Sequence, residues 1–153
     1  MKTSLVTFHQ RGFWVRNDHL CLWLEALGQA IDQQSVPSAW LLTPRHLWHV
    51  QAVNCAMGGS AFVNLDPWVK TEQRKEDLLL LCGQAINNLL AEGEMLSADR
   101  WNVRLRDESI SPKDNAYFSQ ELPTETFLQV GRAFLRLLQG EVFPTGPPFP
   151  VLG

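Results

Sequence analysis

The sequence lacks a long apolar run. Its most apolar stretch, residues 78–91, is about 14 residues long and is interrupted by Gln84, Asn87 and Asn88, whereas about 20 apolar residues are needed to span a bilayer. The start of the chain alternates polar and apolar side chains, without the continuous apolar segment of a secretion signal. We therefore expect a cytoplasmic protein with no membrane association.

Cysteine is scarce, and positive charge is not in surplus. Cys21, Cys55 and Cys82 are odd in number, far apart and surrounded by apolar neighbours. This pattern is typical of small core residues in a reducing cytosol rather than of disulfides or metal ligands. The 13 basic residues are outnumbered by 16 acidic ones, and binding to phosphate backbones requires clustered Lys and Arg. We expect no nucleic-acid partner.

Catalytic signatures are missing as well. The chain has no G-x-S-x-G turn and no glycine-rich phosphate loop. His46 and His49 lie three residues apart on an expected helix, but a metal site needs three or four converging ligands and only these two have a fixed spacing. We expect no metal, no cofactor and no catalytic residue. The alternative is a small enzyme or metal-dependent protein that uses His46, His49 and a cysteine such as Cys55.

The composition is that of an ordinary globular domain. With 153 residues, 45% of them hydrophobic and 19% charged, the chain is expected to fold as one domain over 1–153 without a disulfide or a metal. Periodicity and cap residues predict a helix-dominated α+β fold, in which about four principal helices surround a central apolar helix, 78–91, beside a small N-terminal β element. The expected elements are a hairpin over 4–15, helices over 18–33, 43–57, 66–91 and 124–139, and a short strand over 61–65.

Several local expectations accompany this fold. Asn17 and Asp18 should cap the first helix, and Glu25 should lie on its polar side. Leu22 also falls on that side, so it is either covered by another segment or exposed to a partner. The polar region 94–120 should be a surface excursion with a turn of helix after Ser97 and a turn at 111–112.

The C-terminal residues 143–153 hold four of the nine prolines and must therefore be extended. We expect this Pro-rich segment to lie as a strap along its own domain, anchored by Phe149 and Val151. The alternative is that it serves as a polyproline ligand for a partner.

Tryptophan is the unusual feature of the composition. The chain has six tryptophans and a single tyrosine, and tryptophan is common among the energetic hot spots of interfaces. Trp68 follows Asp66 and precedes Glu72, Glu76 and Asp77. This arrangement predicts a protein-binding edge with Trp68 as the apolar anchor and the carboxylates steering a basic partner. The alternative is that Trp68 closes the end of the core.

The segment Gly12-Phe13-Trp14-Val15, followed by Asp18, Leu20, Trp23 and Leu24, resembles the beginning of small bacterial immunity proteins encoded beside contact-dependent or polymorphic toxins. The resemblance implies a cytosolic protein that binds and blocks one toxin domain and has no activity of its own. It assigns no functional residue, because immunity surfaces differ between pairs.

The sequence thus predicts a protein-binding module whose protein partner is a cognate toxin domain and whose mechanism is occlusion. Two other classes stay open. One is the small enzyme described above. The other is a structural homo-oligomer that buries Leu22 and the exposed tryptophans against a second copy.

Overall fold

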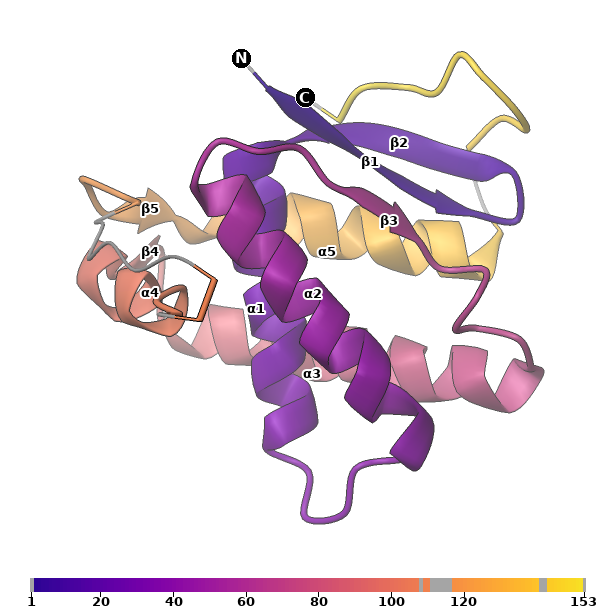
Figure 1. Cartoon of the computed structure of the whole chain (residues 1–153), viewed down its shortest axis with the longest axis horizontal. Helices are drawn as coiled ribbons and strands as arrows, with labels where there is room; N and C mark the ends of the chain where they lie inside the picture. The colour runs from indigo at the N-terminus through magenta and orange to yellow at the C-terminus, as the bar shows by residue number, and fades with distance from the viewer. Residues whose placement is uncertain (1, 108, 111–116, 141–142, 153) are drawn as a thin grey trace.

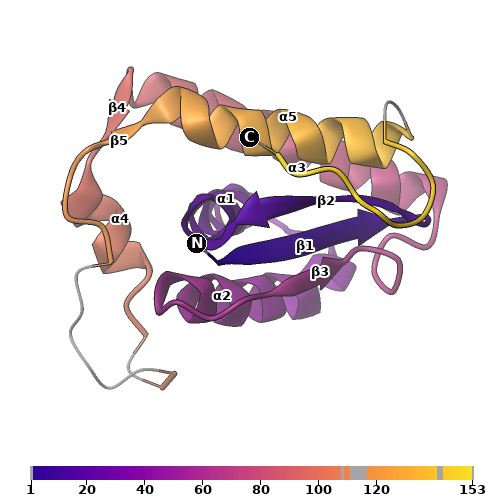
Figure 2. The same cartoon turned by 90° about the horizontal axis from the view of Figure 1, so that it is seen from above.

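A computed structural model describes residues 2–107, 109–110, 117–140 and 143–152. The fold is α+β and dominated by helices, as predicted (Figure 1). Figure 2 shows a small sheet lying between two layers, with α5 on one side and α2 on the other. No helix of the described part is long and apolar enough to cross a membrane.

The chain begins with the predicted hairpin. Strands β1 (Thr3–Phe8) and β2 (Arg11–Arg16) pair antiparallel. They are joined by His9 and Gln10, whose φ angles of 50° and 65° lie in the left-handed region. This is the geometry of the tight hairpin turn whose twist matches that of the strands. Strand β3 (Phe62–Asn64) adds in parallel to the free edge of β1, within the expected segment 61–65.

Helix α1 (Asn17–Asp32) is the centre of the domain. It packs against α2, α3 and α5, and Leu22 is 0% exposed, so this leucine is covered by the chain itself. The predicted cap was wrong, because Arg16 is the N-cap and Asn17 is already helical. Asn17 instead accepts a hydrogen bond from Ser4 Oγ (2.7 Å) and donates one to the Gly59 carbonyl (2.6 Å), which ties the helix start to β1 and to the turn after α2.

Helix α3 (Glu72–Ala91) differs from its prediction in two ways. It begins after Thr71, whose hydroxyl accepts from the Arg74 amide, and not at Asp66. It is also enclosed on one side only, since Leu80 is 74% and Leu90 52% exposed. The fold class is confirmed, but the central helix is α1. A count of apolar residues favoured 78–91, whereas burial depends on how many elements surround a helix.

The remaining elements complete the shell. They are the 3-10 helix η1 (Ala39–Leu41), α2 (Leu42–Ala56), β4 (Met95–Leu96), α4 (Ala98–Arg104), β5 (Leu122–Pro123) and α5 (Thr124–Gln139). Ser97 caps α4 where a turn of helix was expected, and α5 ends at Gly140, whose φ is 75°. The turn expected at 111–112 lies outside the described residues.

The Pro-rich segment lies along the hairpin. The Trp14 amide donates to the Pro150 carbonyl (2.8 Å), and the Leu152 amide donates to the Trp14 carbonyl (2.7 Å), so the segment borders β2. Of the two expected anchors, Phe149 is partly buried but Val151 is 69% exposed and was wrongly predicted, whereas Phe143 stacks on Phe13 with ring centroids 5.4 Å apart. Backbone pairing and one aromatic contact therefore hold the segment.

Candidate functional site

The six tryptophans divide into two classes. Trp23, Trp48 and Trp101 are at most 1% exposed and belong to the core. Trp14, Trp40 and Trp68 are only partly buried, and Trp40 and Trp68 pack against the core. Because Trp14 borders the C-terminal segment, Trp40 and Trp68 are the tryptophans that leave aromatic surface near the charged start of α3.

One arginine contacts the Trp40 ring and the Trp68 backbone. The Arg74 guanidinium lies over the Trp40 ring, 5.3 Å from its centroid, and donates to the Trp68 carbonyl (3.1 Å). The Trp40 indole N–H donates to Asp77 Oδ2 (3.1 Å), so the ring is also fixed at its edge. We call Trp40, Trp68, Arg74 and Asp77 the aromatic cluster. A cation over an indole face and a hydrogen bond at its edge restrict rotation of an exposed ring.

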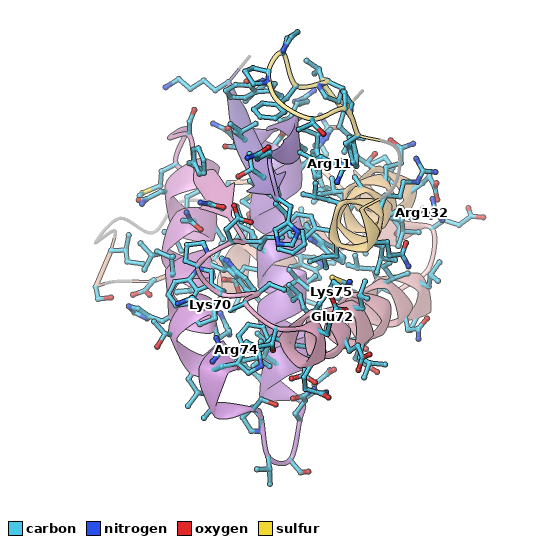
Figure 3. All side chains as sticks on the ribbon, turned by 90° about the vertical axis from the view of Figure 1, so that its right-hand side faces the viewer. Arg11, Lys70, Glu72, Arg74, Lys75 and Arg132 are labelled. Carbon is cyan, nitrogen blue, oxygen red and sulfur yellow. The ribbon has the colours of Figure 1, made fainter. Side chains whose placement is uncertain are left out.

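The predicted carboxylates surround this cluster, but their charges are partly paired. Asp66 Oδ1 accepts from the His9 amide (2.9 Å), and Glu72 forms an ion pair with Lys75 (2.9 Å). Glu76 is exposed one helical turn after Glu72. Figure 3 shows that Lys70, Arg74 and Lys75 gather at the same end of α3 as Glu72. The face therefore carries both signs of charge.

Sequence reasoning named Trp68 and Asp77 for this site but did not assign Trp40 or Arg74 to it. Arg74 and Asp77 are three apart on a helix, so a helix start at Thr71 predicts that they share a face. Trp40 is 37 residues from Asp77, and no local pattern predicts that contact.

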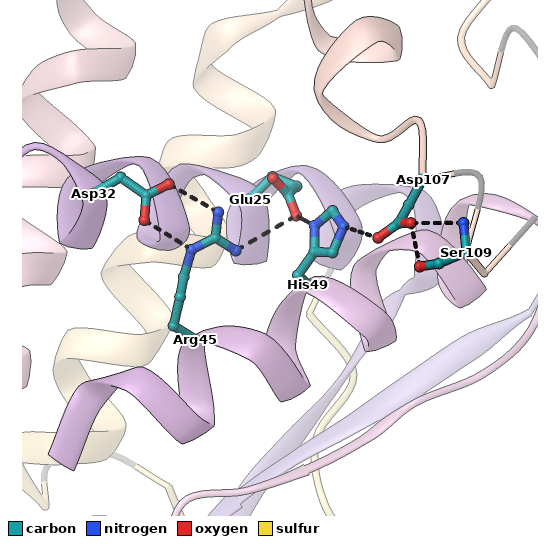
Figure 4. A network of polar contacts seen from close by, with 6 residues as sticks. All are labelled: Glu25, Asp32, Arg45, His49, Asp107 and Ser109. Carbon is teal, nitrogen blue, oxygen red and sulfur yellow. Dashed lines mark hydrogen bonds and ion pairs between the residues drawn. The ribbon is translucent and has the colours of Figure 1, made fainter. Parts of the chain in front are cut away.

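A second polar cluster lies where α1, α2 and the loop after α4 meet (Figure 4). His49 of α2 stands between two carboxylates. Its Nδ1 is 2.5 Å from Glu25 Oε1 on α1, and its Nε2 is 2.8 Å from Asp107 Oδ2 in the loop. Asp107 Oδ1 in turn accepts hydrogen bonds from the amide and the hydroxyl of Ser109. We call Glu25, His49 and Asp107 the histidine clamp.

Arg45 extends the clamp along α1. Its guanidinium donates two hydrogen bonds to Asp32 (3.2 and 3.0 Å) and lies 4.0 Å from Glu25. Burial opposes the charge of Arg45, but Asp32 and Glu25 outweigh it and raise its pKa. The guanidinium can lie across α1 because residue 28 is glycine, where a Cβ atom would come within 2.5 Å of Arg45 Cζ.

Glu25 was expected on the polar side of α1, and the structure shows that this side is covered at Glu25, which is 2% exposed. Helix α2 packs on that face and supplies Arg45 and His49 as cationic partners. A buried carboxylate is tolerated when it is paired and hydrogen-bonded in this way.

The clamp holds His49 as an imidazolium. A neutral imidazole has one N–H, whereas both ring nitrogens here face carboxylate oxygens, and only the protonated ring can donate twice. The hydrogen bond to Glu25 raises the pKa of His49, with Asp107 adding to the effect, while burial and Arg45 oppose it. The hydrogen bond from Ser109, followed by that from His49, lowers the pKa of Asp107. With both nitrogens engaged, the ring has no lone pair for a metal or a substrate proton.

The residues of the enzyme alternative do not converge. His46 is exposed on α2, whereas Cys55 is buried with its sulfur 3.6 Å from Ser4 Oγ. Burial raises the pKa of Cys21, Cys55 and Cys82, which disfavours a reactive thiolate. Within the described residues, no three His, Cys, Asp or Glu side chains are grouped so that they could hold a metal ion.

An open groove of about 500 Å³ lies at the other end of α3. Its lining consists of Leu90, Gly93, Glu94, Thr124, Glu125 and Leu128. In the part of the chain that the structure describes, no segment fills it, and nothing indicates which molecule would do so.

No family model, curated protein or solved structure matches this chain. Function therefore rests on the chemistry of the aromatic cluster and the histidine clamp.

Proposed function

We propose that this protein is a protein-binding module that neutralises a partner by covering its functional surface, most concretely an immunity protein that blocks a bacterial toxin domain in the cytoplasm. The observation that carries the proposal is the pair of partly exposed tryptophans, Trp40 and Trp68: Arg74 and Asp77 hold the Trp40 ring, and Arg74 also binds the Trp68 backbone carbonyl. Binding immobilises side chains at an entropic cost, and rings that are already fixed reduce that cost.

The charges around the cluster suit a basic partner with some acidic groups. The basic groups would be attracted by Glu76 and by Glu72 and Asp66, which stay exposed although each has one partner. Such charges act mainly on the rate of association. Lys70 and Lys75 on the same face would repel a uniformly basic surface. The face therefore favours a partner that alternates the two signs, which gives specificity for one cognate protein.

The first experiment is a pull-down with the tagged protein from its native cell at mild salt, with bound proteins identified by mass. A single stoichiometric partner supports the binding module, and rescue of cells that express this partner supports neutralisation. If the protein elutes alone as a monomer, the proposal is wrong. If it elutes alone as an oligomer, the homo-oligomer alternative replaces it.

The site is then tested with the double variant Trp68→Ala, Glu76→Lys. Loss of a hot-spot tryptophan costs about 2 kcal/mol or more, so dissociation should accelerate roughly thirtyfold, and the charge reversal should slow association in a salt-dependent way. The matched control is Glu94→Lys, Met95→Ala, which reverses one charge and truncates one exposed apolar side chain at the other end of α3. If only the control variant weakens partner binding, the binding site lies at that end of α3 instead.

A further inference from the structure

We propose that His49 is a proton-operated latch that fastens the loop carrying Asp107 to α1 and α2 and releases this loop when the ring loses its Nε2 proton. The proposal concerns the histidine clamp and does not depend on the proposed binding function. It rests on the positions of two carboxylates on opposite sides of one imidazole ring (Figure 4).

The two carboxylates differ in how much they need the ring. Glu25 is 2% exposed, whereas the side chain of Asp107 is 24% exposed and keeps two hydrogen bonds from Ser109. A buried carboxylate that loses its donor suffers a large desolvation penalty, whereas a partly exposed one finds water. When one proton leaves, the remaining N–H should therefore stay on Nδ1 and face Glu25.

The Nε2 lone pair would then point at Asp107 Oδ2 from 2.8 Å. Two acceptors at that distance repel each other, so the contact turns from attractive to repulsive. The proton passes to water, and no other group has to react. Asp107 can follow by moving into solvent, since its own loop supplies the Ser109 bonds.

The charged groups that face His49 from each packed element agree with this sequence of events. Helix α1 presents Glu25, with Asp32 behind it on Arg45, and α2 itself contributes Arg45. The loop presents Asp107, and exposed Arg106 precedes it. The net environment favours the protonated ring, and the hydrogen bonds to Glu25 and Asp107 raise the pKa of His49. The latch is thus closed below the raised pKa of His49 and opens as pH rises through it.

Release should stay local. Helix α4 has an independent attachment, because the Asn102 side chain exchanges two hydrogen bonds with the Phe118 backbone (2.8 and 2.9 Å) and Trp101 is buried. We therefore expect Asp107 and Ser109 to move while 98–105, which ends with the fully buried Leu105, stays in place.

The test is an NMR titration of the full chain with ¹⁵N-labelled histidine and backbone amides, from pH 5 to pH 10. The expected result is His49 with both nitrogens protonated below its midpoint and a neutral Nδ1–H tautomer above it. The amide shifts of Asp107 and Ser109 should change with the same midpoint. A neutral Nε2–H tautomer would overturn the proposal, as would loop shifts that do not follow the His49 titration. Both are measured in the wild-type protein.

The variant Asp107→Asn adds a second, independent readout. Its amide keeps the size of the carboxylate, accepts from Nε2–H at low pH and, after rotation, donates to the lone pair at high pH. The pKa of His49 should fall, and the loop shifts should no longer follow it. The matched control Asp99→Asn changes an exposed carboxylate on α4 and should alter neither. An unchanged His49 midpoint in Asp107→Asn would contradict the latch.

Discussion

Two glycine-to-alanine substitutions on neighbouring helices should change stability in opposite directions. Gly131 lies in α5 where that helix crosses α1 and α3. A Cβ atom there would come within 2.7 Å of Trp23 Cζ3, 2.8 Å of Trp23 Cη2 and 3.1 Å of Ile86 Cγ1. Carbon atoms prefer a separation of about 3.5–4.0 Å, so α5 or the fully buried Trp23 ring must shift by most of an ångström.

The magnitude follows from two opposing effects. Alanine gains about 1 kcal/mol over glycine in a helix, and forcing an extra carbon into a well-packed core costs about 1–3 kcal/mol. Because Trp23 is 0% exposed and a rigid ring cannot yield as a flexible chain end does, the upper part of that range applies. Gly131→Ala should destabilise the protein by about 1–2 kcal/mol, which lowers the melting temperature by roughly 2–4 °C per kcal/mol.

Gly83 of α3 is the matched control. A Cβ atom at residue 83 meets no atom within 4 Å, so only the helix propensity changes. Gly83→Ala should stabilise the protein by about 0.5–1 kcal/mol. Urea unfolding followed by far-UV circular dichroism gives both values. If Gly131→Ala is as stable as the wild type or more so, the close approach of α5 to Trp23 is wrong.

Three further outcomes are expected. Gln10→Gly should raise the free energy of unfolding by roughly 0.5–1 kcal/mol, because Gln10 has a φ of 65° that only glycine adopts without strain; a loss measured by urea unfolding would contradict the turn geometry. Glu25→Gln should destabilise the protein by about 2 kcal/mol, the order of a hydrogen bond to a charged group, and a neutral result in the same assay would mean that Glu25 and His49 are not coupled. The pKa of His49 is raised in the folded protein, so the stability that the protonated ring contributes is complete below about pH 6.5 and is lost as pH rises through the folded pKa. The difference in the free energy of unfolding between the wild type and His49→Gln should therefore shrink between pH 6 and pH 9. A difference that grows with pH would show that the pKa of His49 is lowered by folding.

Local patterns predicted the elements whose signals are local. The hairpin, the helix over 124–139 and its end at Gly140 all depend on alternation, helical spacing or a stop residue, and the structure places them as expected. The cap at Asn17 failed for a tertiary reason, since the Asn17 side chain satisfies Ser4 and Gly59 instead of its own helix.

The candidate sites were predictable only where their residues are close in the chain. Trp68 and its charged neighbours follow one another in sequence, so they could be named together. His49 and Asp107 are 58 residues apart, and His49 and Glu25 are 24 apart. Helical spacing placed Glu25 opposite the apolar stripe of α1, but it contains no information on whether another helix will cover that face.

The aromatic cluster and the histidine clamp differ in how much of their bonding capacity is still available to another molecule. Catalysis by a histidine needs a ring nitrogen within reach of the substrate, and while the clamp is closed both nitrogens of His49 face carboxylates. The aromatic cluster is the reverse case, because a hydrogen bond fixes the edge of the Trp40 ring while Trp40, Trp68 and Glu76 keep accessible surface. A partner can bind an accessible ring surface whose orientation is already fixed without a large entropic cost. The closed clamp could contribute to recognition only after Asp107 has left it, which would make the accessibility of His49 depend on pH.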